Sequence, residues 1–190
     1  TQESARVKEE GQGNGKRALI IGGLGRMGGW FAEFMSMQGY EVHIADINIQ
    51  EEDESHFNSW GDTDDNYDIT VLATPLRQSI EILENILELG RRGIIFDIAS
   101  IKSPIKELLK EISDKGMKVT SIHPMFGPDT DLLTGKHVVF MNIDSHGTHL
   151  EIMKLFESTT AQIIEMSIDS HDYAISYVLG LSHIINIAFS

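Results

Sequence analysis

The sequence predicts an α/β fold with a doubly wound, mostly parallel β-sheet, and two observations support this prediction. Short, continuous apolar runs, such as 18–21, 69–73 and 94–98, are typical of strands that are buried on both faces of a sheet. Between these runs, apolar residues recur at helical spacing. Strands that alternate with helices over this length indicate a parallel sheet with helices packed against it.

The predicted elements begin after a polar, glycine-containing stretch at 1–17, which is typical of a linker or tail. Strands are expected at 18–21, 41–46, 69–73, 94–98, 119–122 and 137–142. Helices are expected before Gly39, at 80–89, from 103 to Gly116, around 148–158 and from 170 onward. We expect Ser103 to cap its helix, with Pro104 in the first turn.

The final segment differs from the rest, because 173–189 is apolar, helical in pattern and without a Gly or Pro stop. We interpret 169–190 as the first helix of a further domain that this chain does not contain. The sequence then divides into a tail at 1–17, one domain at 18–168 and the start of a second. We therefore expect the chain to be a piece of a longer protein.

Charge and composition exclude several classes of protein. Among 190 residues, 15 are Lys or Arg and 29 are Asp or Glu, and the net charge of −14 argues against nucleic acid or an anionic membrane as a partner. No apolar run approaches the ~18 residues of a membrane span, and no export signal is visible, so a cytoplasmic location is the default. Without cysteine there are no disulfides or thiolate nucleophiles, and we expect no metal site. Eight acidic residues lie in 51–68, which we expect to be a solvated excursion.

A glycine motif directly follows the first predicted strand and opens the first helix. It reads Gly23-Leu24-Gly25-Arg26-Met27-Gly28 and matches G-x-G-x-x-G. At a helix start, free backbone N–H groups and the helix dipole favour a pyrophosphate. Gly23 would allow the tight turn, Gly25 the approach of the phosphates, and Gly28 close packing of helix on strand. The alternative is that these glycines only form a tight turn.

Asp46 favours dinucleotide binding over a purely structural turn. It lies 18 residues after Gly28, at the end of the second predicted strand, where a carboxylate can accept hydrogen bonds from a ribose hydroxyl. A carboxylate there would repel a 2′-phosphate, and no Arg or Lys follows closely, so NAD is favoured over NADP. The segment 18–168 is therefore expected to be a Rossmann-type dinucleotide-binding domain.

Three further positions lie at the ends of predicted strands, on the side of the sheet where ligands bind. Thr74-Pro75 and Ser100 are expected to line the cofactor cleft, although both also fit plain turns. His123 follows the strand 119–122 in a loop with two prolines. There it can accept a proton from a hydroxyl group while a hydride leaves the same carbon. A structural or surface histidine is the alternative.

Several of these stretches resemble the prephenate dehydrogenase family. The resemblance rests on Gly22 to Gly28, Ser100-Ile101-Lys102, His123-Pro124-Met125-Phe126-Gly127-Pro128 and His171-Asp172, and it extends from Ala18 to Ser190. It implies NAD-dependent oxidative decarboxylation of prephenate to 4-hydroxyphenylpyruvate, in tyrosine biosynthesis.

The resemblance also implies roles for individual residues. His123 would hydrogen-bond the ring hydroxyl of the substrate and accept its proton, and Ser100 would bond the same hydroxyl or orient His123. His171 and His183 would face the substrate, with helix capping or packing as the alternative. Independently of the resemblance, we expect Lys102 and the helix at the glycine loop to supply positive potential for anionic ligands.

The family adds a helical domain that completes the substrate pocket, forms a homodimer and supplies an Arg for a substrate carboxylate; chorismate mutase is a known fusion partner. The last arginine here is Arg92, so we expect this chain to bind NAD but to turn over prephenate poorly. The alternatives are arogenate as substrate, a 3-hydroxyacid dehydrogenase or imine reductase, and a non-catalytic NAD-binding module. The 3-hydroxyacid dehydrogenases and imine reductases usually use a Lys or Asp in a later helix, and no Lys follows Lys154.

Overall fold

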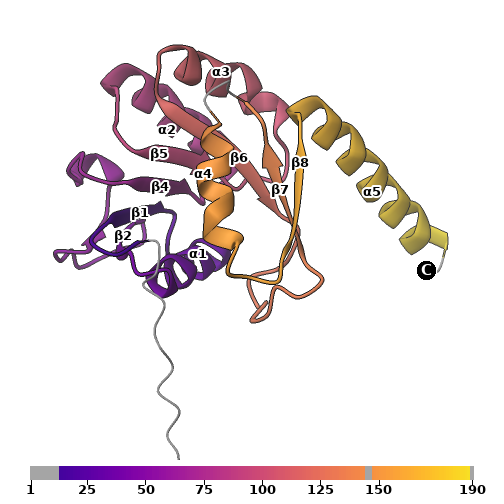
Figure 1. Cartoon of the computed structure of the whole chain (residues 1–190), viewed down its shortest axis with the longest axis horizontal. Coiled ribbons are helices and arrows are strands. Elements are labelled where there is room, and N and C mark those ends of the chain that lie inside the picture. Colours follow the sequence, from indigo (N-terminus) through magenta and orange to yellow (C-terminus); the bar gives the residue numbers. More distant parts are fainter. Residues whose placement is uncertain (1–12, 144–146, 189–190) are drawn as a thin grey trace, which may run out of the picture.

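The computed structural model describes residues 13–143 and 147–188, of which 179, 180 and 182–188 are described by their backbone alone. An eight-stranded sheet with the order β3-β2-β1-β4-β5-β6-β7-β8 forms its centre (Figure 1). The strands are β1 Arg17–Ile21, β2 Glu41–Ala45, β3 His56–Phe57, β4 Ile69–Leu72, β5 Ile94–Asp97, β6 Lys118–Pro124, β7 His137–Met141 and β8 Gln162–Met166. The α-helices are α1 Arg26–Met37, α2 Leu76–Leu89, α3 Lys106–Asp114, α4 Thr148–Met153 and α5 Ile168–Ala188. Short 3-10 turns are η1 Trp60–Asp62, η2 Ser103–Ile105 and η3 Lys154–Phe156.

The strands from β3 to β6 all pair in parallel, whereas β7 is antiparallel to β6 and β8 is parallel to β7. The chain moves outward from β1 to β3 and then returns to the other side of β1 at β4. In such sheets, ligands bind outside the carboxyl ends of the strands, where the strand order reverses. The predicted doubly wound, mostly parallel sheet is confirmed.

Different helices cover the two faces of the sheet, as alternate residues of β1 show. Ala18 and Ile20 share one apolar cluster with side chains of α1 and α4. Leu19 and Ile21 share the other with side chains of α2 and α3. All four residues are buried, because a strand between two helical layers has no solvated face.

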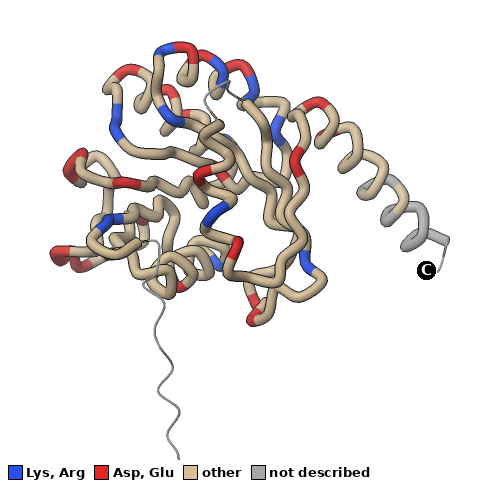
Figure 2. The backbone as a smooth tube through the Cα atoms, in the orientation of Figure 1, with Lys and Arg blue, Asp and Glu red and all other residues tan. Residues whose placement is uncertain are grey.

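Helix α5 extends away from the sheet (Figure 1). Its only Asp, Glu, Lys or Arg residues are Asp169 and Asp172, both in its first two turns, whereas acidic residues are frequent in the loops between β2 and β4 (Figure 2). Among the side chains of this helix that the structure describes, four large apolar ones are exposed, namely Tyr173, Tyr177, Val178 and Leu181. Within the described ranges, no helix has the length and hydropathy that a membrane span requires.

Three sequence-based expectations about elements need correction. His123 lies within β6 and not after it, because antiparallel pairing with β7 continues to Pro124 and places His123 opposite Val139. The acidic excursion is mostly exposed, but it contains β3 and η1 and buries Tyr67. The edge strands β3 and β8 were not expected, since β3 has only two residues and β8 is a mixture of half-buried and exposed residues.

Candidate functional site

Three glycines shape the region between β1 and α1, one through its backbone conformation and two because a side chain would not fit. Gly22 takes the left-handed conformation, with φ of +85°. The tight turn therefore requires Gly22, whereas we expected it to require Gly23. Gly23 lies against β2, where a Cβ would come within 2.5 Å of the Ile44 side chain. A Cβ on Gly28 would overlap the carbonyl oxygen of Gly22, which agrees with the packing role that the motif predicts.

The first turn of α1 has the properties of an anion site. Gly25 is the N-cap residue, no side chain caps the helix, and the first turn contains no acidic residue. The N–H groups at the start of α1 are therefore not neutralised by a side chain from this turn. A Cβ at Gly25 would meet only the Gly22 carbonyl oxygen, at 3.1 Å, among the described residues. Leu24 and Arg26 are exposed, and Met27 packs against the core.

Asp46 is held against the glycine turn. Its Oδ2 accepts a hydrogen bond from the backbone N–H of Leu24 at 3.1 Å. Its Oδ1 accepts from the backbone N–H and the side-chain Nδ2 of Asn48, at 3.0 and 2.9 Å. The structure therefore brings together two features that the sequence separates by about twenty residues, at the carboxyl ends of β1 and β2.

The loops after β4 and β5 lie at the same edge of the sheet. Thr74 contacts the glycine turn, since a Cβ on Gly22 would lie 3.0 Å from its Cγ2, and its hydroxyl bonds Ser79 Oγ at 2.9 Å. Pro75 is the N-cap residue of α2. Ser100 is exposed, and among the described residues no hydrogen bond joins it to His123. A role of Ser100 toward substrate stays a prediction.

The loop after β6 packs on α1 and so connects His123 with the glycine motif. Arg26 Nη2 donates to Asp129 Oδ2 at 2.6 Å. The indole N–H of Trp30 donates to the Thr130 carbonyl at 2.9 Å, and the Trp30 ring contacts Phe126 with 4.8 Å between centroids. These contacts hold the loop that follows His123 over the start of α1.

His123 belongs to a hydrogen-bonded chain that reaches α5. Its Nδ1 lies 2.9 Å from His171 Nε2, and His171 Nδ1 lies 2.7 Å from Asp172 Oδ1. His171 is buried and His123 is half-buried. His123 Nε2 has no partner among the described residues and is not a buried atom, so it remains accessible. The sequence singled out both histidines, but not their contact. The side chain of His183 lies outside the described residues.

The electrostatic surroundings keep the His123 ring neutral. Burial lowers the pKa of His123 to about 4, and the charge of Lys102 and the neighbouring His171 act in the same direction. A neutral ring can accept a proton at neutral pH, as a general base must.

Lys102 has a different place from the one expected. Its side chain is fully buried, and its Nζ donates to Asp97 Oδ1 and to the Ile122 carbonyl, both at 2.7 Å. Burial lowers the pKa of Lys102, and contact with Asp97 opposes this effect. Because its ammonium is buried and paired, Lys102 does not contact a ligand directly, and a contribution of its charge to the potential felt by anionic ligands stays a prediction.

Ser103 likewise does not cap its own helix. Lys102 is the N-cap residue of η2, and the Ser103 hydroxyl donates to Asp172 Oδ2 at 2.5 Å. We expected the Ser103 side chain to accept a hydrogen bond from a backbone N–H at this helix start. Instead, the Asp172 carboxylate of α5 accepts from the backbone N–H groups of Lys102 and Ser103. The residues 69 positions apart meet because α5 begins beside η2.

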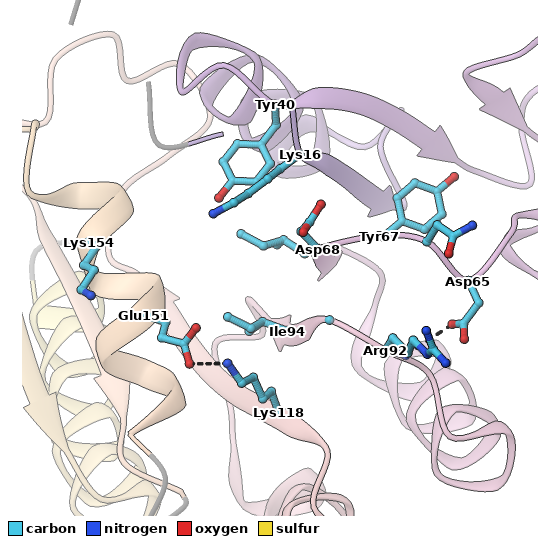
Figure 3. A pocket seen from close by; sticks show the side chains of 13 residues that line it. Lys16, Tyr40, Asp65, Tyr67, Asp68, Arg92, Ile94, Lys118, Glu151 and Lys154 are labelled. Carbon is cyan, nitrogen blue, oxygen red and sulfur yellow. Dashed lines mark hydrogen bonds and ion pairs between the residues drawn. The ribbon is translucent and has the colours of Figure 1, made fainter. Parts of the chain in front are cut away.

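A hollow of about 650 Å³ lies at the opposite edge of the sheet. It is lined at the amino ends of strands, by residues such as Lys16, Asp68, Ile94 and Lys118 (Figure 3). The charged groups there are mixed, and Lys118 pairs with Glu151 at 2.7 Å. It contains neither the glycine turn nor His123, so we do not place the cofactor there. Within the part of the chain that is described, no three His, Asp or Glu side chains are arranged to hold a metal ion.

A doubly wound sheet with a glycine turn, an uncapped helix start and a carboxylate after β2 defines the class of Rossmann-type nucleotide-binding domains. A family model described as the nucleotide-binding domain of prephenate dehydrogenase matches residues 31–165, and the chain belongs to this family. The match begins after the glycine motif, which is therefore an independent observation.

Curated relatives agree with this family. A probable arogenate/prephenate dehydrogenase from Methanocaldococcus jannaschii is 28% identical over 175 residues, which cover 86% of this chain and 39% of that protein. The T-protein of Enterobacter agglomerans is 23% identical over 172 residues, which cover 90% of this chain and 43% of that protein. The chain thus spans about two fifths of the length of these relatives.

Solved structures show the same fold. A crystal structure of prephenate dehydrogenase from A. aeolicus, in complex with hydroxyphenyl propionate and NAD+, has a TM-score of 0.70 at 23% identity and covers 92% of this chain and 68% of its own. An imine reductase from Myxococcus stipitatus in complex with NAD+ has a TM-score of 0.71 at 14% identity, covering 91% of this chain and 63% of its own. At these identities the likeness concerns the fold alone.

Proposed function

We propose that this chain is the cofactor-binding part of an NAD-dependent dehydrogenase that oxidises and decarboxylates prephenate to 4-hydroxyphenylpyruvate. The proposal depends above all on His123, whose Nε2 is accessible near the carboxyl end of β6. The ring is bonded on its other side to His171, and its loop packs on the helix that the glycine turn opens. A histidine with an unpaired Nε2, in a loop region that packs beside the glycine turn, fits a base that acts on a bound alcohol.

The residues at the glycine turn fit a dinucleotide. Gly25 and the uncapped start of α1 would hold the pyrophosphate, and Asp46 would accept from a ribose hydroxyl. The carboxylate of Asp46 disfavours a 2′-phosphate, and residues 47–50 carry no positive charge, which supports NAD over NADP. NAD, when bound, supplies the hydride acceptor.

His123 moves the proton of the reaction. Its neutral Nε2 accepts the proton of the ring hydroxyl, while the carbon that bears this hydroxyl loses a hydride. Carbon dioxide then leaves the ring, its bonding electrons complete an aromatic system, and the oxygen regains a proton. Aromatisation supplies much of the driving force. Because burial keeps the pKa of His123 low, the proton that it accepts is readily passed on.

Arogenate is the second candidate substrate. The name of the Methanocaldococcus jannaschii relative includes both arogenate and prephenate. An Arabidopsis thaliana relative, 25% identical over 116 residues, is named arogenate dehydrogenase 2. Arogenate carries an amino acid side chain in place of the pyruvyl group of prephenate, so the reacting ring is the same. A homodimer, a cytoplasmic location and a fusion to chorismate mutase stay predictions.

An assay of NADH formation with prephenate and with arogenate tests the proposal. We expect turnover by a version extended beyond Ser190, and weak turnover by the 190-residue chain. His123→Asn should lower kcat by about 100-fold or more and leave the Kd for NAD unchanged. The same substitution at His56, in the short strand β3, is the control and should keep the rate. Absence of NADH with both substrates, or full activity of His123→Asn, would contradict the proposal.

A further inference from the structure

Asp172 ends the hydrogen-bonded chain of His123 and His171, and its carboxylate is firmly held. Its Oδ2 accepts from the backbone N–H and the hydroxyl of Ser103, at 2.6 and 2.5 Å. The backbone N–H of Lys102 lies 3.1 Å from Oδ1 and 3.2 Å from Oδ2. Partial burial disfavours the charged form, but hydrogen bonds from Ser103 and His171 outweigh it and hold the pKa of Asp172 below its usual value. Asp172 is therefore an ionised group that can only accept hydrogen bonds.

This acceptor determines the direction of every bond in the chain. Since Asp172 Oδ1 can only accept, His171 must carry its proton on Nδ1. In a neutral His171, Nε2 then has a lone pair and must accept from His123 Nδ1. A neutral His123 is therefore protonated on Nδ1, and its accessible Nε2 has the free lone pair.

We propose that His171 and Asp172 are positioning residues that fix the tautomer of His123, so that its Nε2 is always ready to accept a proton. This inference rests on the proposed function of His123 as a base. It gives His171 a role through His123, in place of the substrate contact that the family resemblance implies. Asp172 and His171 belong to α5, whereas His123 belongs to β6. The tautomer of His123 is therefore fixed only when α5 is docked beside η2.

Substitution Asp172→Asn should reverse the direction of the two hydrogen bonds that link residue 172, His171 and His123. Two donors of Ser103 point at Oδ2, so the single amide oxygen takes that place and the amide NH2 faces His171 Nδ1. His171 must then accept on Nδ1 and donate from Nε2, and His123 must accept on Nδ1 and hold its proton on Nε2. The base would be blocked without loss of any residue that touches substrate. Asp169→Asn is the matched control, since Asp169 lies on the same helix and pairs with Lys106 of α3.

Nitrogen-15 NMR of the histidine rings measures these tautomers directly in the 190-residue chain. At a pH of about 8, above the ordinary histidine pKa of about 6.5, the resonance that is lost in His123→Gln is assigned to His123. We expect His123 to be protonated on Nδ1 in the wild type and in Asp169→Asn, and on Nε2 in Asp172→Asn. A His123 protonated on Nε2 in the wild type would overturn the inference, and so would a folded Asp172→Asn with an unchanged tautomer.

Kinetics of the extended enzyme provide the second readout. Asp172→Asn should lower kcat by about 100-fold or more with little change in the Kd for NAD, whereas Asp169→Asn should keep the wild-type rate. The NMR result needs no substrate, so it separates failure of this inference from failure of the proposed function. A wild-type rate in Asp172→Asn would overturn the inference even if the dehydrogenase activity is confirmed.

Discussion

His123 is the residue at which burial, charge and hydrogen bonding meet. Desolvation penalises its protonated form, and Lys102, buried beneath it and bonded to the Ile122 carbonyl, repels a second positive charge. Asp97 and Asp172 act in the opposite direction but do not compensate. The ring is therefore kept neutral by the fold itself, before any ligand binds.

This depressed pKa predicts a pH dependence of stability. The folded protein binds the His123 proton only below about pH 4, whereas an unfolded histidine binds it below about 6.5. The contribution of neutral His123 to the free energy of unfolding is therefore complete above about 6.5 and is lost as the pH falls from about 6.5 to about 4. His123→Gln should flatten the stability curve in this range, measured by urea unfolding at successive pH values. An unchanged slope would contradict the depressed pKa.

Local sequence signals located part of the site and not the rest. The glycines and His123 directly follow predicted strands and Asp46 ends one, so the edge at which they lie could be predicted. The partners of His171 and Asp172 could not, because they lie 48 and 69 residues away and depend on where α5 docks. The burial of Lys102 was missed for a different reason, since a lysine is ordinarily exposed and its two partners, in β5 and β6, meet it only in the folded sheet.

At the scale of elements, the first turn of α1 contains two neighbouring glycines, Gly28 and Gly29, with different packing requirements. A Cβ on Gly28 would overlap the backbone of Gly22, which cannot move without displacing β1. Among the described residues, a Cβ on Gly29 would meet only the Gly23 carbonyl oxygen, at the ordinary contact distance of 3.7 Å. The motif glycine is thus required by packing, whereas its neighbour is not.

These two positions give a matched pair of substitutions. Gly28→Ala should lower the free energy of unfolding by about 1–3 kcal/mol, as overpacking does, and should weaken NAD binding by shifting the start of α1. Gly29→Ala should be neutral or raise stability by up to about 1 kcal/mol, the gain of Ala over Gly in a helix. Thermal or urea unfolding with and without NAD measures both. Equal losses in the two variants would show that packing at Gly22 is not the cause.

The elements that the sequence predicted well are those with two buried faces or a long apolar stripe. β1, β4 and β5 are continuous buried runs, and their positions agree with the prediction to within a residue. Strand β8 has half-buried and exposed residues and lies at the sheet edge, so its pattern is weak. The length of β6 depends on pairing with β7, which no local signal in β6 contains.

For the whole molecule, the net charge of −14 does not describe the charge at the glycine turn. Acidic residues gather in the loops between β2 and β4, and the hollow at the amino ends of the strands has mixed charges (Figures 2 and 3). At the carboxyl edge, the start of α1 has no acidic residue in its first turn. We therefore expect anionic ligands at the carboxyl edge in spite of the overall charge.

Hydrogen–deuterium exchange with and without NAD tests the position of the cofactor most directly. We expect NAD to slow amide exchange at 22–28 and 46–48, to leave 65–68 and 92–94 at the opposite edge unchanged, and NADP to protect more weakly. Protection confined to the hollow at the amino ends of the strands, or no protection by NAD at any concentration up to solubility, would contradict the account.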